Sequence, residues 1–398
     1  MASASCADAL RRGGADGSVL LIGREPDLPY DRPPCSKGYL RGSVGRDDVL
    51  LHPPGWYDER DVEVLTRTTV LKLDLDRRVA RLSNREEVRF GQALIATGAN
   101  VRRLNVPGAE LDGIHYLRTL GNADAIRADA PGKRVVLVGG SYLGSELAAS
   151  LTELGCECTV MMIEALPLSR GFGDQAGRFF LQVLEAHGVA VHGGHELERF
   201  EGRDGRVTRV VASGGLELEA DAVVVCAGAV PDVTLARAAG LELGESGGVS
   251  VDRCLRTAAP GVYAAGDIAE YESVVHGARR MRIEHWDVAF SQGRTVARNI
   301  LGQERAHDAV PYFFSDISDW ASLEYVGPAF AWDREIVRGS PEEGSFAIFY
   351  VAEQRVVAAL AVGRSEDLVA ARRLIVSGER LGERAARLGD LDSDLDEL

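Results

Sequence analysis

Three glycines and one acid in the middle of the chain have the spacing of a phosphate-binding turn. Gly139, Gly140 and Gly144 follow an apolar run, and Glu164 comes about 20 residues after Gly144. Glycines at such a turn let the backbone approach a pyrophosphate, and the helix that follows offers unpaired N–H groups to it. An acid at this distance accepts hydrogen bonds from a ribose diol. The pattern predicts a site for a dinucleotide.

The residues around this turn predict the strand, helix and strand that must position it. Residues 135–138 are apolar throughout, as expected of a central parallel strand, and 159–163 form a second strand that ends at Glu164. Between them, leucines recur along one face of an expected helix at Leu143, Leu147, Leu151 and Leu154. This setting makes the glycine pattern far more specific than it is alone.

Glu164 also predicts which nicotinamide dinucleotide binds. A carboxylate there repels a 2′-phosphate, so we expect NADH rather than NADPH. Ser141 stands where the second glycine is usual, and its small side chain can be accommodated. Tyr142 and Leu143 complete the turn as cofactor-binding residues. The alternative is a βαβ unit that binds nothing.

The first residues look like the second half of another nucleotide-binding unit. A helix is expected over Ala7–Arg12 and a strand over Ser18–Ile22, with Glu25 as the ribose-binding acid. Counting back about 20 residues from Arg24 or Glu25 lands on Ala4 or Ser5 and places the last glycine position near Ala4, so the first strand and the leading glycines would lie upstream of Met1. We expect roughly ten residues to precede Met1 in the natural chain. The alternative is a short form that binds its nucleotide weakly or not at all.

Composition and charge narrow the class of protein. The 398 residues are 45% hydrophobic and 26% charged, which fits a globular chain of two or three domains. The formal net charge of −15 argues against nucleic acid as a partner. No apolar run reaches the ~18–20 residues of a membrane span, and no secretory signal is present, so a cytoplasmic location is expected. The six cysteines lack metal-site spacing, so no metal is predicted and most are expected to be small buried hydrophobes.

The last part of the chain has its own pattern. "GSFAIFYVAEQRVVAALAVG" predicts two strands around a turn at 352–354, and "EDLVAARRLIVSGER" predicts a helix. The final stretch, "LGDLDSDLDEL", carries five acids and no base. We expect it to be a solvated, flexible end.

Seven segments resemble one family of flavoproteins. In chain order they are "PYDRPPCSKGYL" (29–40), "ALIATGAN" (93–100), "GGSYLGSE" (139–146), "VCAGAVPD" (225–232), "GVYAAGDIAE" (261–270), "MRIEHWDVAF" (281–290) and "PYFFSDISD" (311–319). Together they are similar to FAD-dependent ferredoxin, rubredoxin and oxygenase-coupled reductases and to apoptosis-inducing-factor-like flavoproteins. The resemblance extends over about residues 18 to 320.

The resemblance implies an α/β architecture with two Rossmann-like dinucleotide-binding domains and a C-terminal α+β domain. A discontinuous FAD-binding domain (1–108 and 238–304), whose first strand is missing, encloses an NAD-binding domain (109–237). Residues 305–398 form the C-terminal domain, which in relatives covers the flavin edge and supports dimers. Either a monomer or a homodimer is therefore expected.

The resemblance also assigns residues. Lys37 and Glu146 match a Lys–Glu pair that lies near flavin N5 in relatives, so we expect a contact between them that bridges the two domains and orders the nicotinamide. The alternative for Glu146 is an acid that complements the helix dipole. Phe314 stands where many relatives have tryptophan. Further expected cofactor-binding residues are Arg32, Ala96, Thr97, Gly98, Gly228, Gly266, Asp267, Glu284, His285 and Trp286.

The expected activity is that of an FAD-dependent NADH oxidoreductase, which takes hydride onto flavin and passes single electrons to a ferredoxin- or rubredoxin-like iron–sulfur protein. A first alternative is reduction of a small acceptor such as a quinone, oxygen or a disulfide. Cys35, which replaces a usual leucine, would then be a candidate redox thiol rather than a simple hydrophobe. A second alternative is a flavin-depleted, NAD(H)-binding relative without enzymatic activity.

Overall fold

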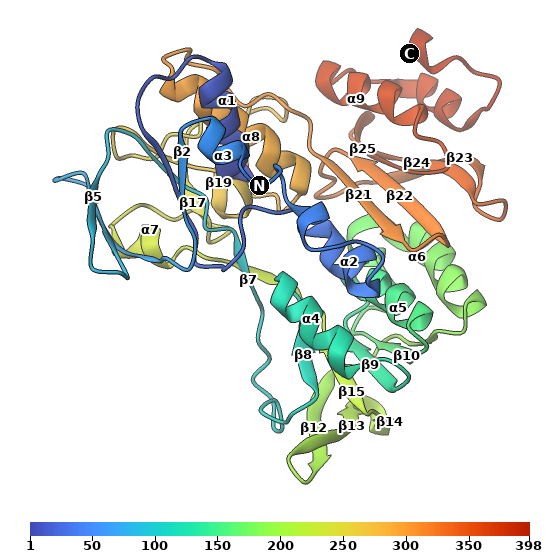
Figure 1. Ribbon diagram of the computed structural model, residues 1–398. Helices are drawn as coiled ribbons and strands as arrows, with labels where there is room; N and C mark the ends of the chain where they lie inside the picture. Colours follow the sequence, from blue (N-terminus) through green and yellow to red (C-terminus); the bar gives the residue numbers. More distant parts are fainter. The chain divides into compact units, whose positions relative to one another are not determined.

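The computed structural model describes residues 1–398 and divides into two compact units, each assembled from three stretches of chain (Figure 1). Unit 1 comprises residues 1–31, 49–100 and 230–313. Unit 2 comprises residues 32–48, 101–229 and 314–398. The functional domain limits expected from the sequence follow a different division and stay a prediction. No helix has the length and apolar character needed to cross a membrane.

Unit 1 is organised around two helices from opposite ends of its sequence. Helix α1 (Ala2–Arg12) begins five residues before the Ala7 expected, and it packs along α8 (Trp286–Ile300). The contact is close because α8 carries Gly293, where a Cβ would lie 2.2 Å from the carbonyl oxygen of Ala2. The hydroxyl of Ser5 also donates to the carbonyl of Phe290 at 3.0 Å. The close approach at Gly293 and this hydrogen bond hold α1 against α8.

Unit 1 contains two separate two-stranded parallel sheets. Strand β1 (Val19–Ile22) pairs with β2 (Val62–Leu65), and β6 (Ala93–Ile95) pairs with β18 (Val262–Ala264). The pairs share no ladder, and all four residues of β1 are only half-buried. The predicted strand over Ser18–Ile22 is confirmed.

The other elements of this part of the chain are short. Two three-stranded sheets contain β3 (Val70–Asp74), β4 (Val79–Leu82) and β5 (Glu87–Arg89), and β17 (Val249–Ser250), β19 (Ala269–Ser273) and β20 (Arg279–Met281). Strand β7 (Ala99–Val101) pairs with β16 (Ala229–Pro231). The short helices are α3 (Trp56–Glu59), α7 (Thr234–Ala238) and the 3₁₀ turns η2 (Asp47–Val49) and η4 (Gly266–Ile268).

Unit 2 contains a five-stranded parallel sheet in the order β11-β10-β9-β15-β8. Its strands are β8 (Ile114–Tyr116), β9 (Arg134–Val138), β10 (Glu157–Met161), β11 (Ala190–His192) and β15 (Ala222–Val225). Helices α4 (Leu120–Asp129), α5 (Tyr142–Glu153) and α6 (Ser169–Ala186) connect them. An antiparallel sheet of β12 (Leu197–Arg203), β13 (Arg206–Ala212) and β14 (Leu216–Glu219) precedes β15, with the turn η3 (Ser213–Gly215).

The predicted strand–turn–helix–strand order is confirmed, with one correction. Leu147 and Leu151 on α5 are fully buried, as the leucine spacing predicts. Strand β10 ends at Met161, two residues before the end that we expected, and Ile163 is 67% exposed. The buried residues of β10 are Cys158, Val160 and Met161.

The C-terminal part of unit 2 is an antiparallel sheet in the order β21-β22-β25-β24-β23, against which α9 packs (Figure 1). It consists of β21 (Tyr312–Ile317), β22 (Ala321–Val326), β23 (Arg334–Ser340), β24 (Ser345–Ala352) and β25 (Arg355–Val362). Helix α9 (Asp367–Ser377) confirms the predicted helix, and β24 and β25 confirm the predicted strands. The chain ends in 3₁₀ turns η5 (Gly382–Gly389) and η6 (Leu395–Glu397).

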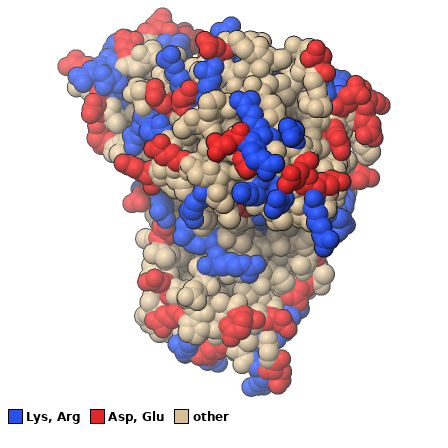
Figure 2. Space-filling model, turned by 90° about the vertical axis from the view of Figure 1, so that its left-hand side faces the viewer, with Lys and Arg blue, Asp and Glu red and all other residues tan.

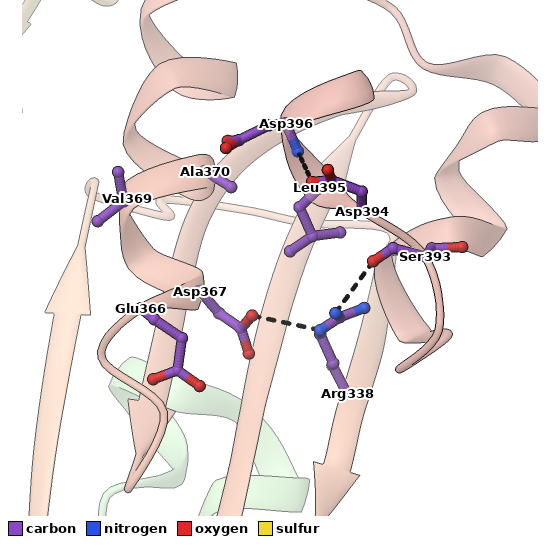
Figure 3. A pocket seen from close by; sticks show the side chains of 9 residues that line it. All are labelled: Arg338, Glu366, Asp367, Val369, Ala370, Ser393, Asp394, Leu395 and Asp396. Carbon is purple, nitrogen blue, oxygen red and sulfur yellow. Dashed lines mark hydrogen bonds and ion pairs between the residues drawn. The ribbon is translucent and has the colours of Figure 1, made fainter.

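The prediction of a solvated, flexible tail is wrong for its backbone. Leu395 and Leu398 are buried, and the guanidinium of Arg338 on β23 donates to the carbonyls of Asp390 and Ser393. Figure 3 shows Arg338 pointing toward Asp367 of α9 and toward Ser393. The acidic side chains do face solvent, but the segment that carries them is anchored to the sheet.

Candidate active site

The glycine turn between β9 and α5 has no room for side chains. A Cβ on Gly144 would lie 2.0 Å from the carbonyl oxygen of Gly139, and one on Gly139, where φ is +119°, would lie 2.5 Å from the carbonyl of Cys226. A Cβ on Gly140 would lie 2.1 Å from the sulfur of Met162. Backbone atoms therefore exclude a side chain at Gly139 and Gly144, whereas at Gly140 the Met162 side chain would have to move.

The first turn of α5 is open to an anion. Ser141 precedes the helix and makes no capping bond through its side chain, and no acid lies in the first turn. Ser141 and Tyr142 are exposed, whereas Leu143 is half-buried. Unpaired N–H groups at a helix start and the absence of negative charge favour a phosphate there.

Glu164 lies in a segment that is bonded to the glycine turn. The backbone N–H of Leu168 donates to the carbonyl of Gly140 at 2.9 Å, and that of Gly194 donates to the carbonyl of Glu164 at 3.1 Å. The Glu164 carboxylate is half-buried and lies 3.9 Å from the guanidinium of Arg170. The structure thus holds the predicted ribose-binding acid at a fixed place beside the turn.

The structure brings Lys37 and Glu146 together. The Nζ atom of Lys37 lies 3.0 Å from Oε1 of Glu146, and their side chains are 14% and 7% exposed. Glu146 lies on the second turn of α5, and Lys37 follows the 3₁₀ turn η1 (Pro33–Ser36) and precedes α2 (Gly38–Arg41). Both residues belong to unit 2. The contact is present, within one compact unit; its bridging of the FAD- and NAD-binding domains and its catalytic role stay predictions.

Of the other residues in this cluster, sequence reasoning found Phe314 but missed Ser36, Ser315 and Asp316. Ser36 donates to Oε2 of Glu146 at 2.5 Å, and Ser315 on β21 donates to Oε1 at 2.6 Å. The ring of Phe314 lies 5.3 Å from Nζ of Lys37, and the carboxylate of Asp316 lies 3.8 Å from it. Ser36 and Ser315 each adjoin a residue that was predicted, so adjacency was the available signal.

In unit 1 the predicted Gly266–Asp267 turn lies against the starts of two helices. Gly266 has φ +76°, and a Cβ there would approach Ala289 of α8 at 3.5 Å and Ala2 of α1 at 3.6 Å. Its N–H donates to Oε1 of Gln292 at 2.8 Å. Nε2 of Gln292 is buried and has no hydrogen-bond partner. The turn thus leaves a buried donor available beside Asp267.

The three residues from Glu284 to Trp286 enter the same region of unit 1. Glu284 forms an ion pair with Arg282, and the indole N–H of Trp286 donates to Asp31 at 2.8 Å. Nδ1 of His285 is buried without a partner, and burial lowers the pKa of this imidazole to about 4. His285 is therefore neutral at pH 7, which suits a structural role better than proton transfer.

The remaining predicted residues are distributed over both units. Thr97 donates to the carbonyl of Asp232 at 2.6 Å, Gly98 has φ +70°, and Ala96 precedes them, half-buried. Glu25 accepts a bond of 2.5 Å from Tyr30. In unit 2, Arg32 donates to the carbonyl of Arg118 at 2.7 Å, and Gly228 has φ +88°.

The six cysteines are all buried, and none forms a disulfide. Burial raises the pKa values of Cys6, Cys158 and Cys226 to about 12. Cys35 is 3% exposed, so a dissolved disulfide has little access to its sulfur. The prediction of small buried hydrophobes is confirmed.

Two family models match nearly the whole chain. The model described as pyridine nucleotide-disulphide oxidoreductase matches residues 1–293, and the one described as reductase C-terminal matches residues 312–398. The protein belongs to the pyridine nucleotide-disulphide oxidoreductase family. Membership confirms the α/β class and the resemblance found in the sequence.

Relatives within this family are similar over almost their full length. The chain is 36% identical to a ferredoxin–NAD(P)⁺ reductase from Sphingomonas sp., over 94% of this chain and 90% of that protein. It is 37% identical to the ferredoxin reductase subunit of a 5,5′-dehydrodivanillate O-demethylase from Sphingobium sp., over 100% and 96% of the two chains.

Solved structures in the same family have the same fold. A ferredoxin reductase from Rhodopseudomonas palustris superposes with a TM-score of 0.94 at 32% identity, covering 100% of this chain and 96% of that one. A structure titled as the covalent putidaredoxin reductase–putidaredoxin complex gives 0.93 at 30% identity, with coverage of 100% and 95%.

The family implies FAD and NAD(P)H as cofactors, and the residues present fit both in part. The crowded glycine turn, the open start of α5 and Glu164 fit a nicotinamide dinucleotide. The buried, unpartnered nitrogens of Gln292 and His285 beside the Asp267 turn fit a further polar group such as a flavin.

Proposed function

We propose that this protein is an FAD-dependent NADH oxidoreductase that passes electrons one at a time to a ferredoxin- or rubredoxin-like iron–sulfur protein. The single observation that carries the proposal is the buried Lys37–Glu146 ion pair beside the dinucleotide turn. Full-length similarity to reductases named for ferredoxin supports the same assignment. FAD, when bound, accepts hydride from NADH and releases single electrons.

The residues of this chain would bind and orient the substrate. The turn at Gly139–Gly144 would hold the pyrophosphate and Glu164 the adenosine ribose. Lys37, fixed by Glu146, would order the nicotinamide, since hydride transfer depends chiefly on positioning. Phe314 would shield this region from water. No residue is required to take up a proton, which agrees with a neutral His285.

Preference for NADH over NADPH belongs to the same proposal. The Glu164 carboxylate would bond to an unmodified ribose diol and repel a 2′-phosphate. Its neighbour Arg170 is exposed, and its guanidinium faces Glu164 at 3.9 Å. Arg170 alone would attract a phosphate, so the charge of Glu164 is the feature that supports NADH.

The acceptor is supported by the relatives and by the surface. The net charge of −15 does not by itself favour docking of an acidic iron–sulfur protein. On the face in Figure 2, however, Lys and Arg side chains are exposed alongside Asp and Glu. Positively charged side chains are therefore present on the surface where such a protein could dock. Arg280 and Arg282 contribute little to it, because they bind Glu270 and Glu284.

Rapid mixing of the flavin-loaded protein with NADH tests the proposal. We expect reduction by NADH, and a loss of about a hundredfold in its rate in Lys37→Met, because misplacement of about 1 Å has that effect. NAD⁺ binding, measured by calorimetry, should survive. The matched control is Arg41→Met on the adjacent α2, which binds Glu153 instead. Unchanged reduction in Lys37→Met would contradict the role given to the pair.

A colourless protein that binds NADH would favour the alternative of a nucleotide-binding relative without activity. The visible absorption of the purified chain distinguishes the two directly. The alternative of disulfide reduction loses support, because Cys35 is buried.

A further inference from the structure

Glu146 is a carboxylate that has been removed almost completely from water. The residue is 6% exposed, and a buried charge is tolerated only when it is paired and hydrogen-bonded. Both oxygens have donors. Lys37 and Ser315 bond to Oε1 at 3.0 and 2.6 Å, and Ser36 bonds to Oε2 at 2.5 Å.

The serine donors come from opposite directions in the sequence. Ser36 is the last residue of η1, and two hydrogen bonds connect it to α5. Its hydroxyl donates to Glu146, and its carbonyl accepts from the hydroxyl of Ser150 at 2.6 Å. Ser315 comes from the C-terminal sheet, 169 residues from Glu146. It is 1% exposed. The carboxylate is therefore clamped between η1 and β21.

Strand β21 supplies consecutive residues to this cluster. Phe314 and Asp316 approach the ammonium of Lys37, and Ser315 between them bonds to Glu146. Because side chains alternate along a strand, Ser315 is buried while its two neighbours are half-buried. Without Ser315, Lys37 would be the sole donor to Oε1. The carboxylate could then turn while it keeps its hydrogen bond from Ser36.

We propose that Ser315 is a positioning residue for hydride transfer, acting through Glu146 to keep the Lys37 ammonium in one place. The inference rests on the proposed function. It assigns the C-terminal sheet an indirect part in the reaction, through one hydroxyl group bonded to Glu146.

A double-mutant cycle tests this inference on the full chain loaded with FAD. Rapid mixing with increasing NADH separates the reduction rate at saturation from the apparent Kd. We expect Ser315→Ala to lower the saturating rate about tenfold and to change Kd by less than about twofold. In the Glu146→Ala background the same substitution should have no further effect, because the group through which it acts is gone.

Controls separate positioning from general damage. Ser340→Ala removes a serine at the end of β23 in the same sheet, where the hydroxyl accepts from the N–H of Glu343, and should not change the rate. Calorimetric titration with NAD⁺ should give the same affinity for Ser315→Ala and the unaltered chain. If Ser315→Ala does not fold, Ser315→Cys keeps the size with a weaker donor and should show the same loss in rate.

Three results would overturn the inference: an unchanged saturating rate, an effect confined to Kd, or equal slowing in the presence and absence of Glu146. Failure of the proposed function is recognised separately, because the unaltered chain would then not be reduced by NADH at all.

Discussion

The hydroxyl of Tyr350 on β24 donates a hydrogen bond of 2.6 Å to the carbonyl oxygen of Phe172 on α6. The next residue, Gly173, kinks the helix with φ +79°, and a Cβ there would lie 2.1 Å from the carboxylate of Glu335. The C-terminal sheet therefore holds α6 at its kink, close to the Glu164–Leu168 segment that is bonded to the glycine turn.

Tyr350→Phe should lower the free energy of unfolding by about 1–3 kcal/mol, because the carbonyl of Phe172 loses a buried donor. Urea denaturation measures the change. Tyr57→Phe is the matched control, since the buried hydroxyl of Tyr57 has no partner and its removal should cost nothing. Equal losses in the two variants would contradict this account of Tyr350.

Gly144→Ala should abolish NADH binding and destabilise the chain by about 1–3 kcal/mol. Its Cβ would meet the carbonyl of Gly139 at 2.0 Å, so the turn must open. Calorimetry with NAD⁺ and urea denaturation check the two effects. Gly155→Ala is a comparison at a glycine with open space around it, although its φ of +79° adds local strain. Normal NAD⁺ affinity in Gly144→Ala would show that the turn does not hold the nucleotide.

Glu164→Gln should raise the ratio of kcat/KM for NADPH to that for NADH by about tenfold, equivalent to ~1.4 kcal/mol. The substitution removes the charge that repels a 2′-phosphate and leaves Arg170 to attract it. Steady-state kinetics with both nucleotides give the ratio. Glu157→Gln, at the exposed start of the preceding strand β10, should leave it unchanged. A falling ratio would reverse the role assigned to Glu164.

Stability should decrease as the pH falls from about 6.5 to about 4. Burial lowers the pKa values of His276, His285 and His307 to about 4, below the usual 6.5, so the unfolded chain binds more protons in this window. Their contribution is complete above pH 6.5 and is lost on acidification. Urea midpoints at several pH values measure it, and His307→Gln should flatten the slope. A urea midpoint that rises on acidification would contradict this account of the three histidines.

Arg338→Met should cost about 1–3 kcal/mol, because Asp367, 5% exposed, would keep Arg364 but lose its second partner. The tail would also lose donors to its backbone. Arg387→Met is the control, since its ion pair with Glu397 is exposed and worth ~0–1 kcal/mol. Thermal unfolding of both variants measures the two losses of stability. Similar small losses would mean that Arg338 does not anchor the tail.

Local patterns predicted the elements that carry the dinucleotide turn. The apolar run before Gly139 and the leucines of α5 depend on neighbours in sequence, and both appear within a residue or two of the expected limits. The end of β10 was harder to predict from the sequence, because an apolar residue such as Ile163 can also lie exposed after the end of a strand. The Lys37–Glu146 contact was predictable only through the family resemblance.

Long-range contacts explain what the sequence did not reveal. The acids of the tail suggest a solvated segment, but Arg338 lies 52 residues before Asp390, and no local pattern pairs them. Ser315 likewise reaches Glu146 across 169 residues. A serine beside a predicted residue is too common to indicate such a bond.

The burial of all six thiols has a practical consequence. Because these sulfur atoms are shielded from reagents in water, maleimide dyes should react slowly with the native chain. A pair of surface cysteines, introduced one in each unit, could then carry fluorophores selectively. Energy transfer between them would report how the two halves of this reductase are arranged in solution and whether nucleotide changes that arrangement.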